Sequence, residues 1–230
     1  MPGKVDVSAD ADIRYYCGRT NAGKRHQLKQ AARKARRLLV YDPDDEYTGE
    51  NCRRYTDAHA LARAVPRDLS SQFRIAFVGN GRADFEVFCR IAWALADCRA
   101  PLTICVDELG GVTPPGKASG TWHTIITRAR KYRMTVLAGG ALPAEIDKTI
   151  MRQRTYLWCG ALERPGDRAY IAAETGIPVQ QLEQLRGKPH FEYVEKHAGC
   201  EPRAVLARRK PAAKKKAAAK KKAARKPSRQ

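Results

Sequence analysis

Short apolar runs alternate along the chain with stretches in which apolar residues recur at helical spacing. The apolar runs predict strands at residues 13–17, 37–41, 73–78, 102–106, 135–138 and 156–159. The helical spacing predicts helices at residues 23–35, 56–64, 83–98 and 121–130, with Thr56 as the N-cap of the second. Strands that alternate with helices are typical of a mainly parallel sheet covered by helices on both faces. We therefore expect an α/β fold.

Outside this alternating region the pattern is less regular. Residues 1–11 are polar and acidic and read as an N-terminal arm, and the alternating region forms a core at 12–165. A short helix at 179–186 and an alternating edge strand at 190–194 predict a small C-terminal extension, residues 166–206. The remaining residues, 207–230, are rich in Lys and Ala.

Charge separates this tail from the rest of the chain. The net charge is +20, and twelve of the 44 basic residues lie in 207–230, which contains no acid. Dense like charge opposes helix formation, so we expect disorder in the isolated tail. A run of this density binds the phosphates of DNA or RNA without reading sequence, and the alternative is a tail that only aids solubility. The lysines we expect to bind DNA are Lys214, Lys215, Lys216, Lys220, Lys221 and Lys222.

The cysteines and the N-terminus point to an intracellular protein. The seven cysteines contain no C-x-x-C pair, and several lie in apolar runs, which favours buried, reduced thiols. Cys200 follows His190 and His197, but their spacing fits no zinc pattern. There is no signal-peptide core and no apolar run of membrane-spanning length, so we expect no membrane partner and a cytoplasmic location.

One strand-to-helix junction carries a glycine-rich loop. Gly18, Gly23 and Lys24 have the spacing G-x-x-x-x-G-K between a predicted strand and a predicted helix. In such a loop the backbone N–H groups form a nest, the helix N-terminus adds positive potential, and the lysine reaches the terminal phosphates. The alternative is a glycine-containing turn beside a surface lysine. The residues we expect to bind ATP are Gly18, Arg19, Thr20, Asn21, Ala22, Gly23, Lys24, Arg25 and His26.

Arg25 departs from this motif, which has Ser or Thr at that position. The usual hydroxyl is a hard oxygen ligand for Mg²⁺, and arginine cannot ligate a cation. Two outcomes are open. Arg25 could point at the nucleotide phosphates and partly replace the charge of the metal, or it could point away and leave the metal position to water.

A second nucleotide signal lies at the end of the predicted strand 102–106. Asp107 and Glu108 follow it directly. In a P-loop protein an aspartate at this place supports Mg²⁺ and a glutamate polarises the attacking water. Both need the carboxyl end of a strand beside the loop, where ligands bind in open α/β sheets. An acidic pair at the end of a solvated strand would be the alternative.

The order of these pieces resembles the FtsK/HerA-type P-loop ATPases, most closely the compact DNA-packaging ATPases of bacterial viruses. The loop is followed by residues 40–47, by the acidic pair, by 125–136 and by 142–150. The resemblance covers roughly residues 12–195 and rests on the order and spacing of the pieces.

The resemblance implies a motor that forms a homo-oligomeric ring and uses ATP to move double-stranded DNA. It assigns phosphate binding to Lys24, support of Mg²⁺ to Asp107 and activation of water to Glu108. Arg128 or Arg130 would act across a subunit interface as an arginine finger, unless both belong to a solvated basic face. A viral capsid or portal vertex would be a further partner, in the host cytoplasm or on the virion.

Two departures from the family bear on hydrolysis. Family members carry a polar Ser-Gln-Arg run that senses the terminal phosphate, whereas this chain has Gly140, Ala141 and Leu142 there. The loop hydroxyl is also replaced, by Arg25. Glu108 argues the other way, because it has little use without hydrolysis. Two functions stay open: a DNA motor with weakened ATPase activity, and a nucleotide-binding, non-hydrolysing DNA-binding or assembly protein.

Overall fold

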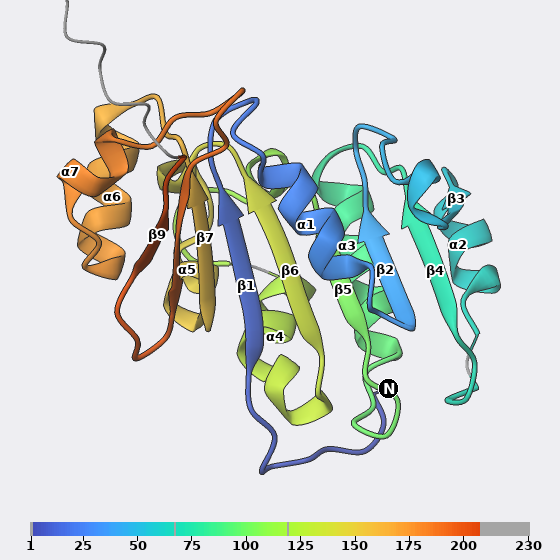
Figure 1. Ribbon diagram of the computed structural model, residues 1–230. Helices are drawn as coiled ribbons and strands as arrows, with labels where there is room; N and C mark the ends of the chain where they lie inside the picture. The colour runs from blue at the N-terminus through green and yellow to red at the C-terminus, as the bar shows by residue number, and fades with distance from the viewer. Residues whose placement is uncertain (1, 67, 119, 208–230) are drawn as a thin grey trace, which may run out of the picture.

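The computed structural model describes residues 2–66, 68–118 and 120–207, in which nine strands form one sheet (Figure 1). Its order is β3-β4-β2-β5-β6-β1-β7-β8-β9. The first seven of these strands run parallel, and β8 and β9 are antiparallel to their neighbours. The strands are β1 Asp12–Cys17, β2 Arg37–Tyr41, β3 Arg53–Tyr55, β4 Phe73–Phe77, β5 Thr103–Val106, β6 Thr135–Gly140, β7 Tyr156–Gly160, β8 Tyr193–His197 and β9 Arg203–Val205. The expected α/β fold with a mainly parallel sheet is confirmed.

Helices cover both faces of the sheet. The α-helices are α1 Lys24–Ala32, α2 Ala58–Ala64, α3 Gly81–Ala94, α4 Gly120–Arg128, α5 Lys148–Gln153, α6 Pro165–Thr175 and α7 Val179–Glu183. Short 3-10 helices lie at η1 Thr48–Glu50, η2 Leu109–Gly111, η3 Ala129–Tyr132 and η4 Pro143–Glu145. Helix α1 packs on one face, and α3 and α4 pack on the other (Figure 1).

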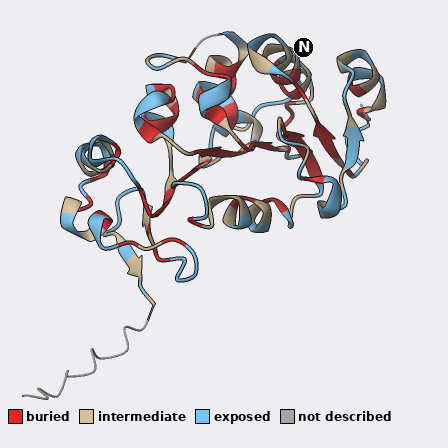
Figure 2. Ribbon diagram, turned by 90° about the horizontal axis from the view of Figure 1, so that it is seen from above, coloured by how far each residue is buried: buried red, intermediate tan, exposed pale blue. Residues whose placement is uncertain are grey.

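The core is split by the sheet into two layers. Along β1, Tyr15 and Cys17 belong to the larger layer and Tyr16 to the layer under α1. Alternate residues of a strand point to opposite faces, so a strand covered on both faces is apolar throughout. Strand β2 is accordingly buried at every position. Figure 2 shows the buried residues gathered in the sheet and on the helix sides that face it.

Several predicted boundaries are wrong. Helix α2 is capped by Asp57, not Thr56, because the Asp57 carboxylate accepts a 2.7 Å hydrogen bond from the Ala60 N–H. The edge strand begins at Tyr193 rather than at 190, since the preceding residues form a loop. The elements β3, β9, α5 and α6 were not predicted, because β3, β9 and α5 are too short to show a clear period and only three of the 11 residues of α6 are buried.

The N-terminal arm and the C-terminal extension both join the main body. The Gly3 N–H donates to the Ala96 carbonyl at 2.7 Å, and the Asp6 N–H donates to the Lys131 carbonyl at 2.6 Å. At the other end of the chain, α6 begins at Pro165, and β8 and β9 continue the same sheet. Of the Lys/Ala-rich tail, only Ala207 lies within the described residues, so the tail prediction falls outside them.

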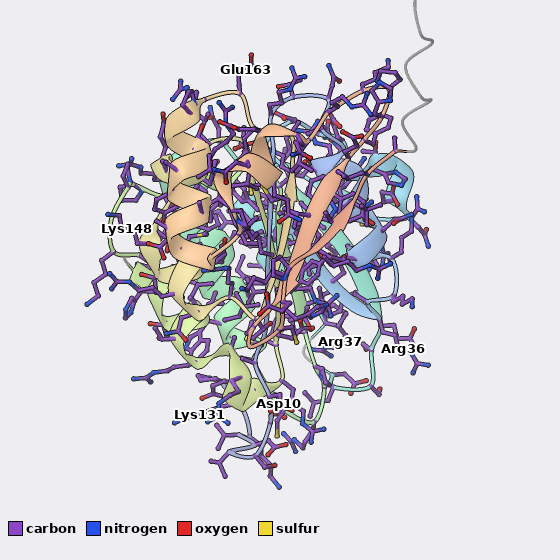
Figure 3. All side chains as sticks on the ribbon, turned by 60° about the vertical axis from the view of Figure 1, so that its left-hand side comes forward. Asp10, Arg36, Arg37, Lys131, Lys148 and Glu163 are labelled. Atoms are coloured by element: carbon purple, nitrogen blue, oxygen red, sulfur yellow. The ribbon has the colours of Figure 1, made fainter. Side chains whose placement is uncertain are left out.

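The parallel strands direct their carboxyl ends to one edge of the sheet. The loops after β1, β5 and β6 meet at this edge. Figure 3 shows Glu163, which follows β7, at this end of the molecule, and Lys131 and Asp10 at the opposite end. Ligands of open α/β sheets bind at the carboxyl edge. Among the described residues, no helix combines the length and apolar character needed to cross a bilayer.

Candidate active site

The loop between β1 and α1 has the backbone of a phosphate nest. Gly18 has φ +150° and Gly23, the N-cap residue of α1, has φ +99°. A Cβ on Gly18 would lie 3.0 Å from the Cβ of Ala22, so the tight curve of the loop leaves no room for a side chain there. Asn21 is also left-handed, with φ +63°. These conformations curl the chain so that N–H groups face inward.

The inward N–H groups are available to a ligand. Two groups of the loop are used internally, since Arg19 N–H donates to the Ala161 carbonyl and Ala22 N–H to the Arg19 carbonyl. Within the described part of the chain, the N–H groups of Thr20, Asn21 and Gly23 donate no hydrogen bond. Open donors at a helix N-terminus fit a polyphosphate, so the loop suits the triphosphate of ATP.

Lys24 and Glu108 form the centre of the site. The Lys24 Nζ lies 2.8 Å from Glu108 Oε2, and the lysine side chain is only 12% exposed. The other carboxylate oxygen, Oε1, accepts a 3.2 Å hydrogen bond from the Ala141 N–H. Lys24 from the loop, Glu108 after β5 and Ala141 after β6 are thus joined by hydrogen bonds. Ala141 lacks a sensor side chain, but its backbone fixes the direction of the Glu108 carboxylate.

Arg25 points away from the loop into a cluster of acids. Its Nε lies 2.7 Å from Asp107 Oδ2, and a terminal nitrogen lies 2.6 Å from Asp44 Oδ2. The second terminal nitrogen is paired with Glu46. The guanidinium is 31% exposed and Asp107 1%, so the pair to Asp107 is the most shielded of the three. Arg25 therefore offsets part of the negative charge of the acids that follow β2 and β5.

The burial of Asp107 disfavours the ionised form of its carboxyl group. Burial raises the pKa of this carboxyl above its usual value of 3.8, while the charges of Arg25 and Lys24 oppose the rise. Its Oδ1 is buried and has no hydrogen-bond partner among the described residues. Arg25 is thus the only side chain of those described that donates a hydrogen bond to Asp107.

This donor set does not fit Mg²⁺. One Asp107 oxygen is bound to a guanidinium, and Arg25 offers no ligand oxygen where the motif has a hydroxyl. Over residues 2–66, 68–118 and 120–207, no group of three or more His, Cys, Asp or Glu side chains could hold a metal ion. Arg25 therefore competes with a metal ion for Asp107.

A cleft opens above these residues. It has a volume of about 480 Å³, within the range of small-ligand pockets. Seven of the residues predicted to bind ATP line it: Arg19, Thr20, Asn21, Gly23, Lys24, Arg25 and His26. Four lining residues were not predicted to bind ATP: Asp44, Glu108, Ala141 and Phe191. Of the remaining predicted loop residues, Gly18 shapes the turn and Ala22 is fully buried beneath it.

The chain has a relative among phage proteins. No protein-family model matches it. It is 30% identical over 174 residues to Protein P9 of Pseudoalteromonas phage PM2, a match that covers 75% of this chain and 78% of the phage protein. The chain belongs to the family of Protein P9.

Solved structures share the fold of this P9-family protein. The genome packaging NTPase B204 from Sulfolobus turreted icosahedral virus 2, in complex with AMPPCP, has a TM-score of 0.66 at 11% identity, over 84% of this chain and 96% of B204. VirB4 of Thermoanaerobacter pseudethanolicus has a TM-score of 0.61 at 12% identity, over 91% and 97% of the two chains. The resemblance to packaging ATPases is therefore confirmed at the level of the fold.

Arg128 and Arg130 do not lie at the cleft. Arg128 is the last residue of α4, and Arg130 lies in η3, next to Lys131. This is the amino edge of the sheet, opposite the end where Glu163 lies (Figure 3). Arg130 is bound there, since its guanidinium donates 2.8 Å hydrogen bonds to the carbonyls of Val7 and Ala9. A role for either arginine in a neighbouring subunit stays a prediction.

Four residues of the site were missed by sequence reasoning. Asp44 and Glu46 gave a signal, because they form an acidic run after β2, the strand that pairs with β5. Asp42 is fully buried, and its carboxylate holds the backbone of that run by accepting hydrogen bonds from the N–H groups of Glu46 and Tyr47. Phe191 gave no signal, because it lies far along the chain in an irregular segment.

Proposed function

We propose that this protein is an ATPase that drives double-stranded DNA into a viral particle. The observation that carries this proposal is the phosphate loop whose lysine contacts a glutamate at the end of the neighbouring strand, 2.8 Å away. A P-loop lysine beside a carboxylate is the arrangement of a nucleotide hydrolase that activates water. Protein P9 of a phage and the genome packaging NTPase B204 support the viral context.

The Lys24–Glu108 contact suggests how ATP starts the reaction. The terminal phosphates compete with the carboxylate for the lysine ammonium, and their greater charge favours them. Glu108 then keeps its bond to the Ala141 N–H and gains a free oxygen. That oxygen accepts a proton from water as the water oxygen attacks the γ-phosphorus. The bond to the β-phosphate oxygen breaks, and ADP and phosphate leave.

Arg25 weakens the part that Mg²⁺ plays in this proposal. When bound, Mg²⁺ supplies charge that screens the β- and γ-phosphates in ATPases. Here the Arg25 guanidinium is tied to Asp107 at 2.7 Å and to Asp44 at 2.6 Å, so Asp107 is not free to support the metal. We expect nucleotide binding to depend little on Mg²⁺ and hydrolysis to be slower than in P-loop enzymes with the loop hydroxyl.

The remaining parts of the motor follow from the family. A homo-oligomeric ring would encircle the DNA, and the basic residues of 207–230 would hold the track by its phosphates. A capsid or portal vertex would anchor the ring, in the host cytoplasm or on the virion.

The second candidate is a nucleotide-binding protein that does not hydrolyse ATP and serves in DNA binding or assembly. The Arg25–Asp107 pair favours it, because the aspartate expected to support a metal is occupied.

Hydrolysis of ATP by the full chain, with and without double-stranded DNA, separates the two. The motor predicts turnover that DNA stimulates and that Glu108→Gln abolishes. Val7→Ala serves as a control, since it shortens a 71% exposed side chain of the N-terminal arm that has no part in the proposed reaction. Tight ATP binding with no turnover in any of the three proteins would refute the motor in favour of the second candidate.

A further inference from the structure

Phe191 borders the nucleotide cleft from the side opposite Glu108. The sheet order near the loop is β5-β6-β1-β7-β8. Glu108 and Ala141 follow β5 and β6, on one side of β1, whereas Phe191 precedes β8, on the other side. All three line the same cleft. The loop after β1 therefore lies between Glu108 and Ala141 on one side and the phenyl ring on the other.

Core packing does not account for the position of Phe191. Phe191 is 47% exposed. Among the described residues it is the one aromatic side chain in the set of large exposed apolar residues, since the others are aliphatic. Its backbone is left-handed, with φ +49°, which is strained for a bulky residue. The ring nevertheless lies against the phosphate loop, because a Cβ on Gly23 would be 3.3 Å from its Cδ1.

The segment that carries Phe191 is tied to the phosphate loop at one end and clamped at the other. The Lys188 N–H donates a 2.9 Å hydrogen bond to the Asn21 carbonyl. Glu192, 1% exposed, accepts two hydrogen bonds from the Arg186 guanidinium, at 3.0 and 2.6 Å, and one from the Arg186 N–H at 2.9 Å. The ring is thus held at the cleft by contacts that do not involve the ring itself.

We propose that Phe191 is the platform on which the purine base of the bound nucleotide stacks. This rests on the proposed function, in which Lys24 and Glu108 mark the position of the terminal phosphate. The base is at the other end of the nucleotide, so it lies toward the β8 side of the loop, where the exposed ring stands. An aromatic face held in place loses little freedom when a base stacks on it.

Stacking also defines which nucleotides the site accepts. Every base has a π-face, so a phenyl ring does not distinguish adenine from guanine. A purine offers a larger face than a pyrimidine. ATP and GTP should therefore bind with similar affinity, and CTP and UTP more weakly.

Calorimetric titration of the full chain with ATP and with inorganic tripolyphosphate tests this role. Salt high enough to suppress binding to the basic tail is used throughout. Phe191→Ala should weaken ATP binding about tenfold and leave tripolyphosphate binding unchanged, whereas Phe191→Trp should stay within about twofold of the wild type for both. Val7→Ala, which shortens a 71% exposed side chain in the N-terminal arm, is the matched control.

The outcomes separate the stacking role from the proposed function. Unchanged ATP affinity in Phe191→Ala would overturn the stacking role alone. An equal loss of ATP and tripolyphosphate affinity would overturn it too, because the side chain would then act on the phosphate loop. Wild-type protein that binds neither ligand would overturn the proposed nucleotide site and the stacking role together.

Discussion

The pair between Arg25 and Asp107 should contribute measurably to the stability of the fold. Replacing Arg25 with Ala leaves the carboxylate of Asp107, 1% exposed, without its guanidinium. Breaking a buried pair costs about 3–5 kcal/mol, and the 31% exposure of Arg25 reduces this to about 2–3 kcal/mol through solvent screening. The half-exposed pairs to Asp44 and Glu46 add about 0.2–1 kcal/mol each. We expect a total loss of about 3 kcal/mol.

Urea unfolding of a double-mutant cycle measures this interaction. If the free energy of unfolding falls by about 3 kcal/mol per molar urea, Arg25→Ala should lower the unfolding midpoint by about 1 M. Asp107→Asn should cost about 1 kcal/mol, because it removes the buried charge itself. The double variant should then be about 2 kcal/mol more stable than the sum of the single losses predicts. Losses that add within about 0.5 kcal/mol would refute the pairing.

The same variants should differ in their response to pH. Burial raises the pKa of Asp107 in the folded protein, so the folded state binds its proton more strongly than the unfolded chain does. Stability from this group is therefore full below the unfolded pKa of 3.8 and is lost as pH rises through the folded pKa. Without Arg25 the folded pKa rises further, so the deficit of Arg25→Ala should be smaller at about pH 5 than at about pH 8. A deficit independent of pH would contradict this account, and in the Asp107→Asn background the dependence should disappear.

Three further predictions concern the reaction and its partners. Arg25→Thr should supply the hydroxyl of the loop motif and free Asp107, so ATP turnover should rise by about tenfold or more when the rate is titrated against Mg²⁺. A rate insensitive to the metal would show that Arg25 does not slow hydrolysis. Glu108→Gln should lower turnover by about 10²–10⁴-fold while ATP still binds in calorimetry, since a general base is lost and the loop is kept; unchanged turnover would remove Glu108 from the mechanism. Deletion of 207–230 should weaken DNA binding and flatten the slope of log affinity against log salt, by about 0.9 for each DNA phosphate that the tail neutralises, in a titration at several salt concentrations; an unchanged slope would mean that the tail does not bind the DNA.

The buried central strands of the sheet and the phosphate loop could be predicted from the sequence. Strands β2, β4 and β5 are predicted within a residue or so of their bounds, because a strand buried on both faces is marked by a local run of apolar residues. The loop between Gly18 and Lys24 is equally local, since its glycine spacing alone specifies the curl of the backbone. Glu108 could be placed beside it because parallel strands all end at one edge of a sheet.

The contacts of the side chains in this site could not be predicted from the sequence. Arg25 is long and flexible, and the sequence left it free to face the phosphates or to turn away; the acids after β2 and β5 draw it to Asp107. Arg130 lies near the acidic pair in sequence order, yet α4 carries it to the opposite edge and the N-terminal arm binds it there. Phe191 reaches the loop because β8 runs antiparallel to β7, the neighbour of β1, so the segment before β8 lies at the same edge as the loop after β1. Local spacing specifies the backbone of an element, whereas contacts between distant residues depend on strand order and on the balance of charge and burial in the assembled fold.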